Sequence, residues 1–323
     1  MKVLVYGAGV IGGQIVHTLC ACGHDVTVVA RGAWAETLRK NGLRIRHYIQ
    51  QKNTTDFPHV MERYDGTEYV AVLAVMQYRQ MDALLPALAA VNSPLVILIG
   101  NNLSATEMER SILEQTGTSK TVLFGFGSTA GQRKDGIITS VHTGDGILTV
   151  GGLHAEAPFE AKKEIARLFS GSKCSINYCD NMDAWLKYHA AFILPVVYLC
   201  YATGCDLRRA TNAQRRLLLD GAEDAYGLLM AMGYPVRPAG DERNFHGAMR
   251  FVMEGVIYLT AKTRLGALCT TEHRKNAPQE MEDLDAAFLA LRGKAPDYPM
   301  PHFDRLRAMM SWERVQETYG SAG

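Results

Sequence analysis

Short apolar runs alternate with helical patterns through the first half of the chain. The runs that predict buried strands lie at Lys2–Tyr6, Val26–Ala30, Tyr69–Val75, Leu95–Ile99 and Thr121–Phe124. Between the first two, Ile11–Cys22 has the apolar spacing of a helix. Strands that are apolar on both faces and separated by helices are typical of a parallel sheet with crossover helices. The pattern therefore predicts an α/β domain at the start of the chain.

The pattern continues with shorter elements before it changes. Ile137–Ser140 and Ile147–Val150 flank a turn-rich stretch with two glycines, which predicts a β-hairpin. Ala157–Ser170 is amphipathic and predicts a helix, and Cys174–Cys179 predicts a last strand.

From about Asn181 to Tyr319, helical patterns dominate and strand signals are few. A chain of 323 residues is also longer than most single domains. We therefore expect two domains, residues 1–179 around the sheet and an all-helical domain at residues 180–323.

One stretch of the second half, Tyr188–Thr203, is almost entirely apolar. It is short for a membrane span and contains His189 and Pro195, with Lys187 at its edge. It predicts a buried core helix, bent near Pro195, and no membrane partner.

Composition narrows the classes of function. The chain is 47% apolar and 21% charged, and its net charge of +1 gives no reason to expect a nucleic-acid partner. The seven cysteines form no Cys-x-x-Cys pair, so we expect reduced thiols and no metal site. The chain opens on Met1-Lys2 and an apolar strand, without a secretory signal, which predicts a cytoplasmic protein.

The first strand is followed by a glycine-rich turn, Gly7-Ala8-Gly9-Val10-Ile11-Gly12, that opens the first helix. In this context the three glycines are typical of a dinucleotide-binding Rossmann domain, a doubly wound parallel sheet. Gly7 permits the tight turn, Gly9 lets the backbone approach a pyrophosphate, and Gly12 lets the helix pack closely on the strand. The N–H groups at the helix start would receive the phosphates. The alternative is a glycine-rich turn without a ligand.

The end of the second strand indicates which nicotinamide cofactor is used. NAD-binding domains place Asp or Glu there for the ribose 2′-hydroxyl. Here the strand is followed by Arg31, and the first acidic residue is Glu36. A guanidinium can pair with a 2′-phosphate, so NADPH is favoured over NADH. The alternative is a solvated loop arginine.

A hydride-transfer enzyme also needs a proton donor beside the carbonyl oxygen of its substrate. Lys187 is the candidate because it begins the most apolar helix of the chain, where it would be partly removed from water. By itself, a helix lysine extending towards solvent is the simpler interpretation.

Further motifs, in the same order along nearly the whole chain, resemble the ketopantoate reductase (2-dehydropantoate 2-reductase) family. They are the Gly7–Gly12 turn with Arg31, Val96-Ile-Leu-Ile-Gly-Asn101-Asn102, Gly125-x-x-Ser-Thr129-Ala-Gly131 with His142-x-Gly144-x-Gly146, Trp185-x-Lys187, and Pro299-Met-Pro301-x-x-Asp304-x-Leu306. The resemblance implies NADPH-dependent reduction of a small 2-oxo acid to a D-2-hydroxy acid, as in pantothenate biosynthesis. It also implies that Lys187 supplies the proton and that Asn101 positions lysine and cofactor. Asn102 is the fallback for Asn101, and a strand-end turn residue is the alternative for both.

The chain departs from the family pattern where substrate is bound. The family asparagine four residues after the lysine is Ala191 here, and His189 lies about 200° around the helix from Lys187. The family lysine after the fourth strand is replaced near Met76, and Arg79 is the residue that could compensate.

The family glutamate that binds the substrate hydroxyl corresponds by position to Glu280, and Glu272 is the local lookalike. A surface-helix glutamate is the alternative for both.

Three functions remain open: reduction of a ketopantoate-like 2-oxo acid, reduction of a different carbonyl or imine, and non-catalytic regulation through NADPH binding. Each needs NADPH, and the first two need a small-molecule substrate. The resemblance implies dimerisation through the helical domain, which leaves a homodimer open.

Overall fold

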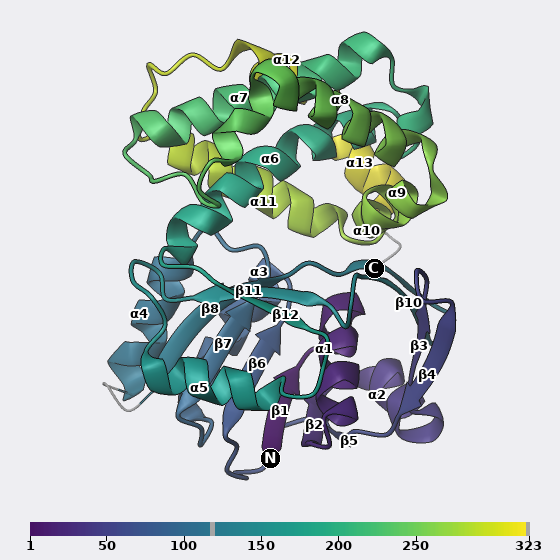
Figure 1. Cartoon of the computed structure of the whole chain (residues 1–323), viewed down its shortest axis with the longest axis vertical. Helices are drawn as coiled ribbons and strands as arrows, with labels where there is room; N and C mark the ends of the chain where they lie inside the picture. The colour runs from purple at the N-terminus through teal and green to yellow at the C-terminus, as the bar shows by residue number, and fades with distance from the viewer. Residues whose placement is uncertain (117–119, 321–323) are drawn as a thin grey trace. The chain divides into compact units, whose positions relative to one another are not determined.

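The computed structural model describes residues 1–116 and 120–320, apart from the side chain of residue 273. The chain divides into two compact units, Met1–Asp183 and Ala184–Gly323 (Figure 1). The division lies a little after the 179/180 boundary expected from the sequence pattern. The first unit contains the strands and the second is all-helical, so the predicted fold class is confirmed.

The first unit is built on an eight-stranded sheet with the order β12-β11-β8-β7-β6-β1-β2-β5. The five predicted strands are present as β1 (Lys2–Tyr6), β2 (Asp25–Val29), β6 (Ala71–Val75), β7 (Leu95–Ile99) and β8 (Thr121–Gly127). They pair in parallel, and every residue of β6 and β7 is buried. Strands covered on both faces need apolar residues at every position, which is why apolar runs in the sequence predicted these strands.

The remaining strands of this sheet lie at its two edges. They are β5 (His59–Met61), β11 (Ile147–Gly151) and β12 (Ser175–Tyr178). The β11 strand runs antiparallel to β8, and β12 pairs in parallel with β11. The sheet is therefore parallel in its centre and mixed at one edge.

Helices cover both faces of this sheet. Those of the first unit are α1 (Val10–Ala21), α2 (Gly32–Asn41), α3 (Tyr78–Ala90), α4 (Ala105–Thr116) and α5 (Phe159–Leu168). Side chains of α1, α2 and α5 share one apolar core with the strands, and α5 crosses the near face of the sheet in Figure 1. Helices α3 and α4 pack against each other outside that core.

The predicted hairpin of Ile137–Ser140 with Ile147–Val150 is wrong. The first run is β10 (Ile137–Val141), which belongs to a second sheet with the order β4-β3-β10-β9, whereas the second run is β11 of the main sheet. The turn between them, with Gly144 at φ +55°, carries the chain from one sheet to the other. Turn residues indicate where a strand ends, but the partner of each strand is decided by distant segments.

The second sheet consists of β3 (Leu43–His47), β4 (Lys52–Asp56), β9 (Ala130–Lys134) and β10. It packs on α1, and the approach is close because a Cβ at Gly13 would lie 2.5 Å from Cδ1 of Ile138. Three histidines form a polar layer in this contact. His47 forms two hydrogen bonds, from Nδ1 to His142 Nε2 at 2.9 Å and from Nε2 to Thr54 Oγ1 at 2.8 Å. His17 Nδ1 forms one with Asp56 Oδ2 at 2.7 Å.

Burial keeps two of these histidines uncharged near neutral pH. Burial, with His17 and His142 nearby, lowers the pKa of His47 from 6.5 to about 4. Burial also lowers the pKa of His142. The second sheet thus contains a neutral hydrogen-bonded pair, His47 with His142, next to the contact that Asp56 makes with His17 of α1.

The second unit consists of helices joined by short turns. Its elements are α6 (Met182–Ala202), η2 (Leu207–Arg209), α7 (Asn212–Ala231), η3 (Asp241–Phe245), α8 (Gly247–Lys262), α9 (Arg264–Cys269), α10 (Thr271–Asn276), α11 (Pro278–Arg292), α12 (Pro301–Arg307) and α13 (Trp312–Tyr319). The apolar stretch after Lys187 lies in α6, whose side chains are mostly buried. Within the described residues, no helix has the length and apolar content to cross a membrane.

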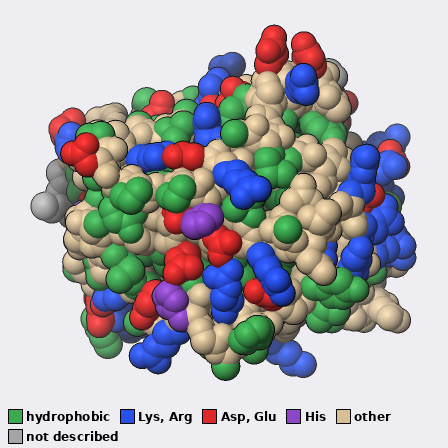
Figure 2. Space-filling model, turned by 90° about the horizontal axis from the view of Figure 1, so that it is seen from above, with side chains coloured by type: hydrophobic (Ala, Val, Ile, Leu, Met, Phe, Trp, Pro, Cys, Tyr) green, Lys and Arg blue, Asp and Glu red, His purple; other side chains and the backbone are tan. Residues whose placement is uncertain are grey.

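A buried carboxylate connects the helices of this unit. Asp285 of α11 is 2% exposed and accepts hydrogen bonds from Tyr198 of α6, Arg307 of α12 and Trp312 of α13. Outside this core, acidic and basic side chains are mixed with apolar ones on the face shown in Figure 2. Arg250, for example, pairs with Asp220. This mixing is consistent with the small net charge of the chain.

The histidine layer predicts that stability falls as the pH drops from 6.5 towards 4. In that window the unfolded chain binds a proton at His47 that the folded state does not bind, so protonation favours unfolding. The shift of the pKa of His47 corresponds to roughly 3 kcal/mol at full effect. Urea unfolding between pH 7 and about pH 4 measures this slope.

The variant His47→Gln removes the group that titrates, so its stability should depend less on pH in this window. The matched control is His59→Gln, at an exposed position of β5, which should keep the wild-type slope. Equal slopes for the wild-type protein and His47→Gln would contradict the assignment.

Candidate functional site

The glycine-rich turn lies where β1 ends and α1 begins. Gly7 has a φ of +88°, and a Cβ there would lie 2.3 Å from the carbonyl oxygen of Val75 at the end of β6. A Cβ at Gly12 would lie 2.0 Å from the carbonyl oxygen of Gly7. Both positions therefore require glycine, the first for its backbone conformation and the second because the helix packs against the turn.

Gly9 differs from the other two glycines because it faces open space. It is exposed, and no atom lies within 4 Å of the position that its Cβ would take. Gly9 is also the N-cap residue of α1, and no side chain caps this helix start. The N–H groups of the first turn have no acceptor within the helix and carry the positive end of its dipole. The space beside Gly9 thus fits a phosphate group.

The other residues of the glycine-rich turn are more buried than Gly9. Ala8 is buried, while Val10 and Ile11 are half-buried at the start of α1. The Ala8 carbonyl accepts a hydrogen bond from Trp34 Nε1 at 3.0 Å. Sequence reasoning missed Trp34, because an aromatic residue in a helix gives no signal of which backbone atom it meets.

Arg31 lies next to this turn. It is the exposed N-cap residue of α2, two residues after β2, and Gly7 N–H donates to the Val29 carbonyl of β2 at 3.3 Å. Within the part of the chain that is described, the Arg31 guanidinium has no hydrogen bond or ion pair. An anionic group could therefore pair with it.

Arg31 also acts on Tyr6, the last residue of β1. Burial raises the pKa of Tyr6 to about 12, Tyr64 and Tyr69 add to the rise, and the charge of Arg31 opposes it. The buried Tyr6 hydroxyl has no hydrogen-bond partner in the described structure. The charge of Arg31 thus lies within electrostatic range of this unsatisfied hydroxyl.

The structure distinguishes Asn101 from Asn102. Asn102 is buried, and its Oδ1 accepts from Ser104 N–H at 2.9 Å while its Nδ2 donates to Met108 Sδ at 3.2 Å. This side chain organises the start of α4. Asn101 is half-buried and lines a small pocket with Met76 and Tyr78 at the ends of β6 and β7.

The first unit thus gathers part of the expected site at the carboxyl ends of its central strands. Gly7 and Met76 lie side by side, since a Cβ at Gly7 would be 3.2 Å from Cγ of Met76, and Asn101 lines the same pocket as Met76. Arg79, the expected substitute for a lysine near Met76, is exposed in the first turn of α3.

Lys187 belongs to α6, at the beginning of the second unit. Its residue is 5% exposed, and its Nζ lies 4.9 Å from the centroid of the Tyr234 ring. A cation over an aromatic face is stabilised where water is scarce. Lys187 is therefore a buried amine with a defined position, and it does not extend freely into solvent.

The neighbours of Lys187 on α6 are apolar or aromatic. Ala191, one helical turn later, is fully buried. His189 stacks on Trp185 with ring centroids 5.1 Å apart, and burial together with Arg274 lowers its pKa to about 4. His189 is therefore a neutral, stacked ring at pH 7.

The two candidate glutamates, Glu272 and Glu280, differ in their surroundings. Glu272 on α10 pairs with Lys275 at 3.1 Å. Glu280 lies in the first turn of α11 and is 7% exposed, so it is not a surface residue. A carboxylate at this position is stabilised by the helix dipole.

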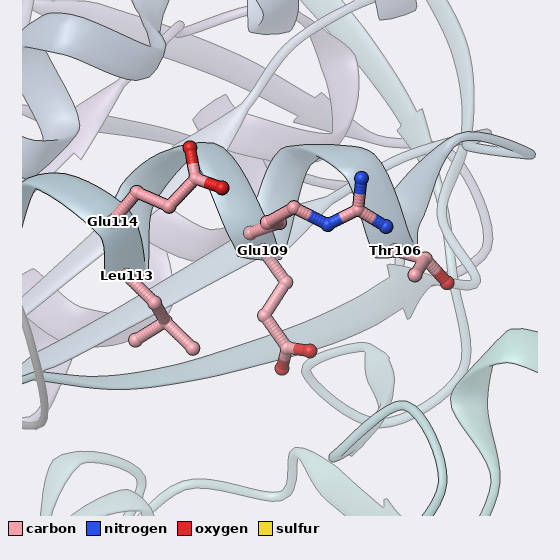
Figure 3. Close-up of a pocket in the computed structure, with 5 residues that line it drawn as sticks. Thr106, Glu109, Leu113 and Glu114 are labelled. Carbon is pink, nitrogen blue, oxygen red and sulfur yellow. The ribbon is translucent and has the colours of Figure 1, made fainter.

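Neither a surface hollow nor a cluster of metal-binding side chains gives a further site among the described residues. A hollow on α4 is lined by Thr106, Glu109, Leu113 and Glu114, which all project from that one helix (Figure 3). Burial raises the pKa of Glu109 there and the nearby His154 opposes the rise, but all the residues that line the hollow belong to α4. Among the described residues, no three His, Cys, Asp or Glu side chains are grouped to hold a metal ion.

Comparison with known proteins supports the family resemblance. Residues 3–154 match the family described as ketopantoate reductase PanE/ApbA. A 2-dehydropantoate 2-reductase of Pyrococcus horikoshii is 26% identical over 189 residues, which are 57% of this chain and 58% of that protein. The matched part thus spans less than two thirds of this relative.

Solved structures match the fold over nearly the whole chain. A PanE/ApbA family ketopantoate reductase from Ralstonia eutropha JMP134 has a TM-score of 0.73 at 18% identity, covering 99% of this chain and 100% of that one. D-mandelate dehydrogenase with NADH and anilino(oxo)acetate has a TM-score of 0.72 at 14% identity, covering 100% and 99%. The resemblance inferred from the motifs is therefore confirmed: residues 3–154 match the ketopantoate reductase PanE/ApbA family, and the fold is similar to that of solved ketopantoate reductases.

Proposed function

We propose that this protein reduces a small 2-oxo acid to the 2-hydroxy acid with NADPH. The observation that carries the proposal is the open helix start at Gly9 with the unpaired guanidinium of Arg31 beside it. A helix N-terminus receives a pyrophosphate, and an arginine after the second strand receives a 2′-phosphate. The family match and the buried lysine of α6 support reduction of a carbonyl.

In this function each residue of the first unit has one task. The N–H groups that follow Gly9 bind the pyrophosphate, and Arg31 pairs with the 2′-phosphate. Asn101 orients the nicotinamide end, because it lies at the end of β7 beside the pocket lined by Met76. When bound, NADPH supplies the hydride.

The second unit supplies the proton and binds substrate. Lys187 gives a proton from Nζ to the oxygen that was the carbonyl oxygen, and the Tyr234 ring keeps the ammonium in place beforehand. Glu280 accepts a hydrogen bond from the resulting hydroxyl. Both side chains are almost fully buried, so water competes little with the substrate for them.

A second candidate keeps the reaction and changes the substrate. The buried methyl group of Ala191 stands where the family has an amide, which removes one polar contact near Lys187. The fold is also similar to that of a D-mandelate dehydrogenase, whose structure contains NADH and anilino(oxo)acetate, a ligand with an aromatic ring. A 2-oxo acid with an apolar or aromatic side chain is therefore the alternative to ketopantoate.

We expect the purified protein to oxidise NADPH when ketopantoate or another 2-oxo acid is added. Lys187→Met keeps the length of the side chain without its amine, so turnover should fall roughly 100- to 10,000-fold. The affinity for NADPH should stay unchanged, because Lys187 belongs to the second unit and the nucleotide-binding residues to the first. Absorbance at the nicotinamide band measures turnover, and calorimetry measures binding.

The control for this variant is Lys262→Met, at an exposed position on α8. It should keep turnover. Full activity of Lys187→Met would reject Lys187 as the proton donor. Tight NADPH binding without turnover on any 2-oxo acid would instead favour a non-catalytic regulator.

The cofactor preference depends on Arg31. We expect Arg31→Ala to weaken NADPH binding about 10- to 100-fold, because a charge-assisted pair with the 2′-phosphate is lost. NADH has no such phosphate, so its affinity should change little. Titration of both nucleotides by calorimetry tests this difference, and equal weakening of the two would remove the basis for NADPH.

A further inference from the structure

A tryptophan is fixed against the dinucleotide turn. Trp34 lies in the first part of α2, three residues after Arg31, and its Nε1 donates to the Ala8 carbonyl at 3.0 Å. The ring is half-buried and packs against the apolar core. The indole therefore keeps one position beside the glycine-rich turn.

A second arginine rests on this ring from another part of the chain. Arg133 belongs to β9 of the second sheet, and its Cζ lies 4.7 Å from the centroid of the Trp34 ring. Stacking of a guanidinium on an indole is favourable and fixes the plane of the guanidinium. The topology thus brings Arg133 to the dinucleotide turn from about a hundred residues away in the sequence.

The charge of Arg133 has no counter-ion in the described structure. Its guanidinium takes part in no hydrogen bond or ion pair with any described residue. Arg133 is an exposed residue whose guanidinium is partly buried, and this partial burial lowers its pKa. A cation that loses water without gaining an anion is unfavourable, and an anionic ligand would offset that cost.

The neighbouring charges do not supply that anion. Glu36 is exposed on α2 two residues after Trp34, about 200° further around the helix. Asp135 is exposed after the end of β9, with a φ of +51°. Arg31 itself is a second unpaired guanidinium, at the N-cap of the helix that contains Trp34.

We propose that Arg133, held on the Trp34 ring, is a second binding residue for the adenosine 2′-phosphate of NADPH, together with Arg31. This assignment rests on the proposed function and names a specificity residue that the dinucleotide motif does not contain. A phosphate dianion accepts hydrogen bonds from two guanidinium groups at once, and each group can bind it through two N–H donors. NADH presents only a neutral hydroxyl at that position, so Arg133 favours the binding of NADPH over that of NADH.

The test measures binding of two small nucleotides, 2′,5′-ADP and 5′-AMP, by calorimetry on the full-length protein. They differ only by the 2′-phosphate. Arg133→Met keeps the aliphatic stem on Trp34 and removes the charge. We expect it to weaken 2′,5′-ADP binding at least about tenfold and to leave 5′-AMP binding unchanged.

Two further variants separate charge, geometry and packing. Arg133→Lys keeps the charge without the planar fork, so its loss should be intermediate. Lys134→Met is the matched control: it lies next in β9, is exposed, and points to the opposite face of the strand. It should bind both nucleotides like the wild-type protein.

The outcomes distinguish this inference from the function on which it rests. If Arg31→Ala loses the preference for 2′,5′-ADP while Arg133→Met retains it, the inference is overturned and the NADPH assignment stands. Equal weakening of both nucleotides by Arg133→Met also overturns it, because that pattern indicates a general effect on the fold. If the wild-type protein binds the two nucleotides equally, both assignments fail.

Discussion

The close contact between α1 and the turn that precedes it determines the geometry of the first unit. The backbone of Gly12 lies against the Gly7 carbonyl and has no room for a Cβ, and a Cβ at Gly13 would force the Ile138 side chain of the second sheet to move. Helix α1 is thereby held between two sheets. Its first turn is left open at Gly9, at the carboxyl end of the central strands, where a phosphate can approach.

The electrostatic environment at the start of α1 differs from that further along the helix. Further along α1, His17 lies with His47 and His142 in a buried layer in which burial lowers the pKa of His47 and His142. At the start of α1, the helix dipole and two unpaired guanidinium groups favour an anion. The contacts of this layer hold the second sheet in place through groups other than the start of α1. The same sheet then presents Arg133 to the turn.

The charged groups buried in the second unit are stabilised by hydrogen bonds or by contact with an aromatic ring. Asp285 is buried because four N–H or O–H donors from three other helices converge on it, and Lys187 is buried over an aromatic ring. The first of these groups joins helices, and the second is the proton donor that we propose. Both are stable only because the surrounding side chains replace the water that each charge has lost.

Local sequence determined the central strands, the glycine-rich turn, Arg31 and the buried α6 helix, because each is specified by residue spacing over one element. The sequence did not reveal the second sheet or the separate partners of β10 and β11, since strand pairing depends on segments far apart in the chain. The tertiary structure also showed that Asn102 has a structural task at the start of α4. It showed that Glu280 is buried and that Arg133 meets Trp34, because burial and contact arise only when distant elements pack together.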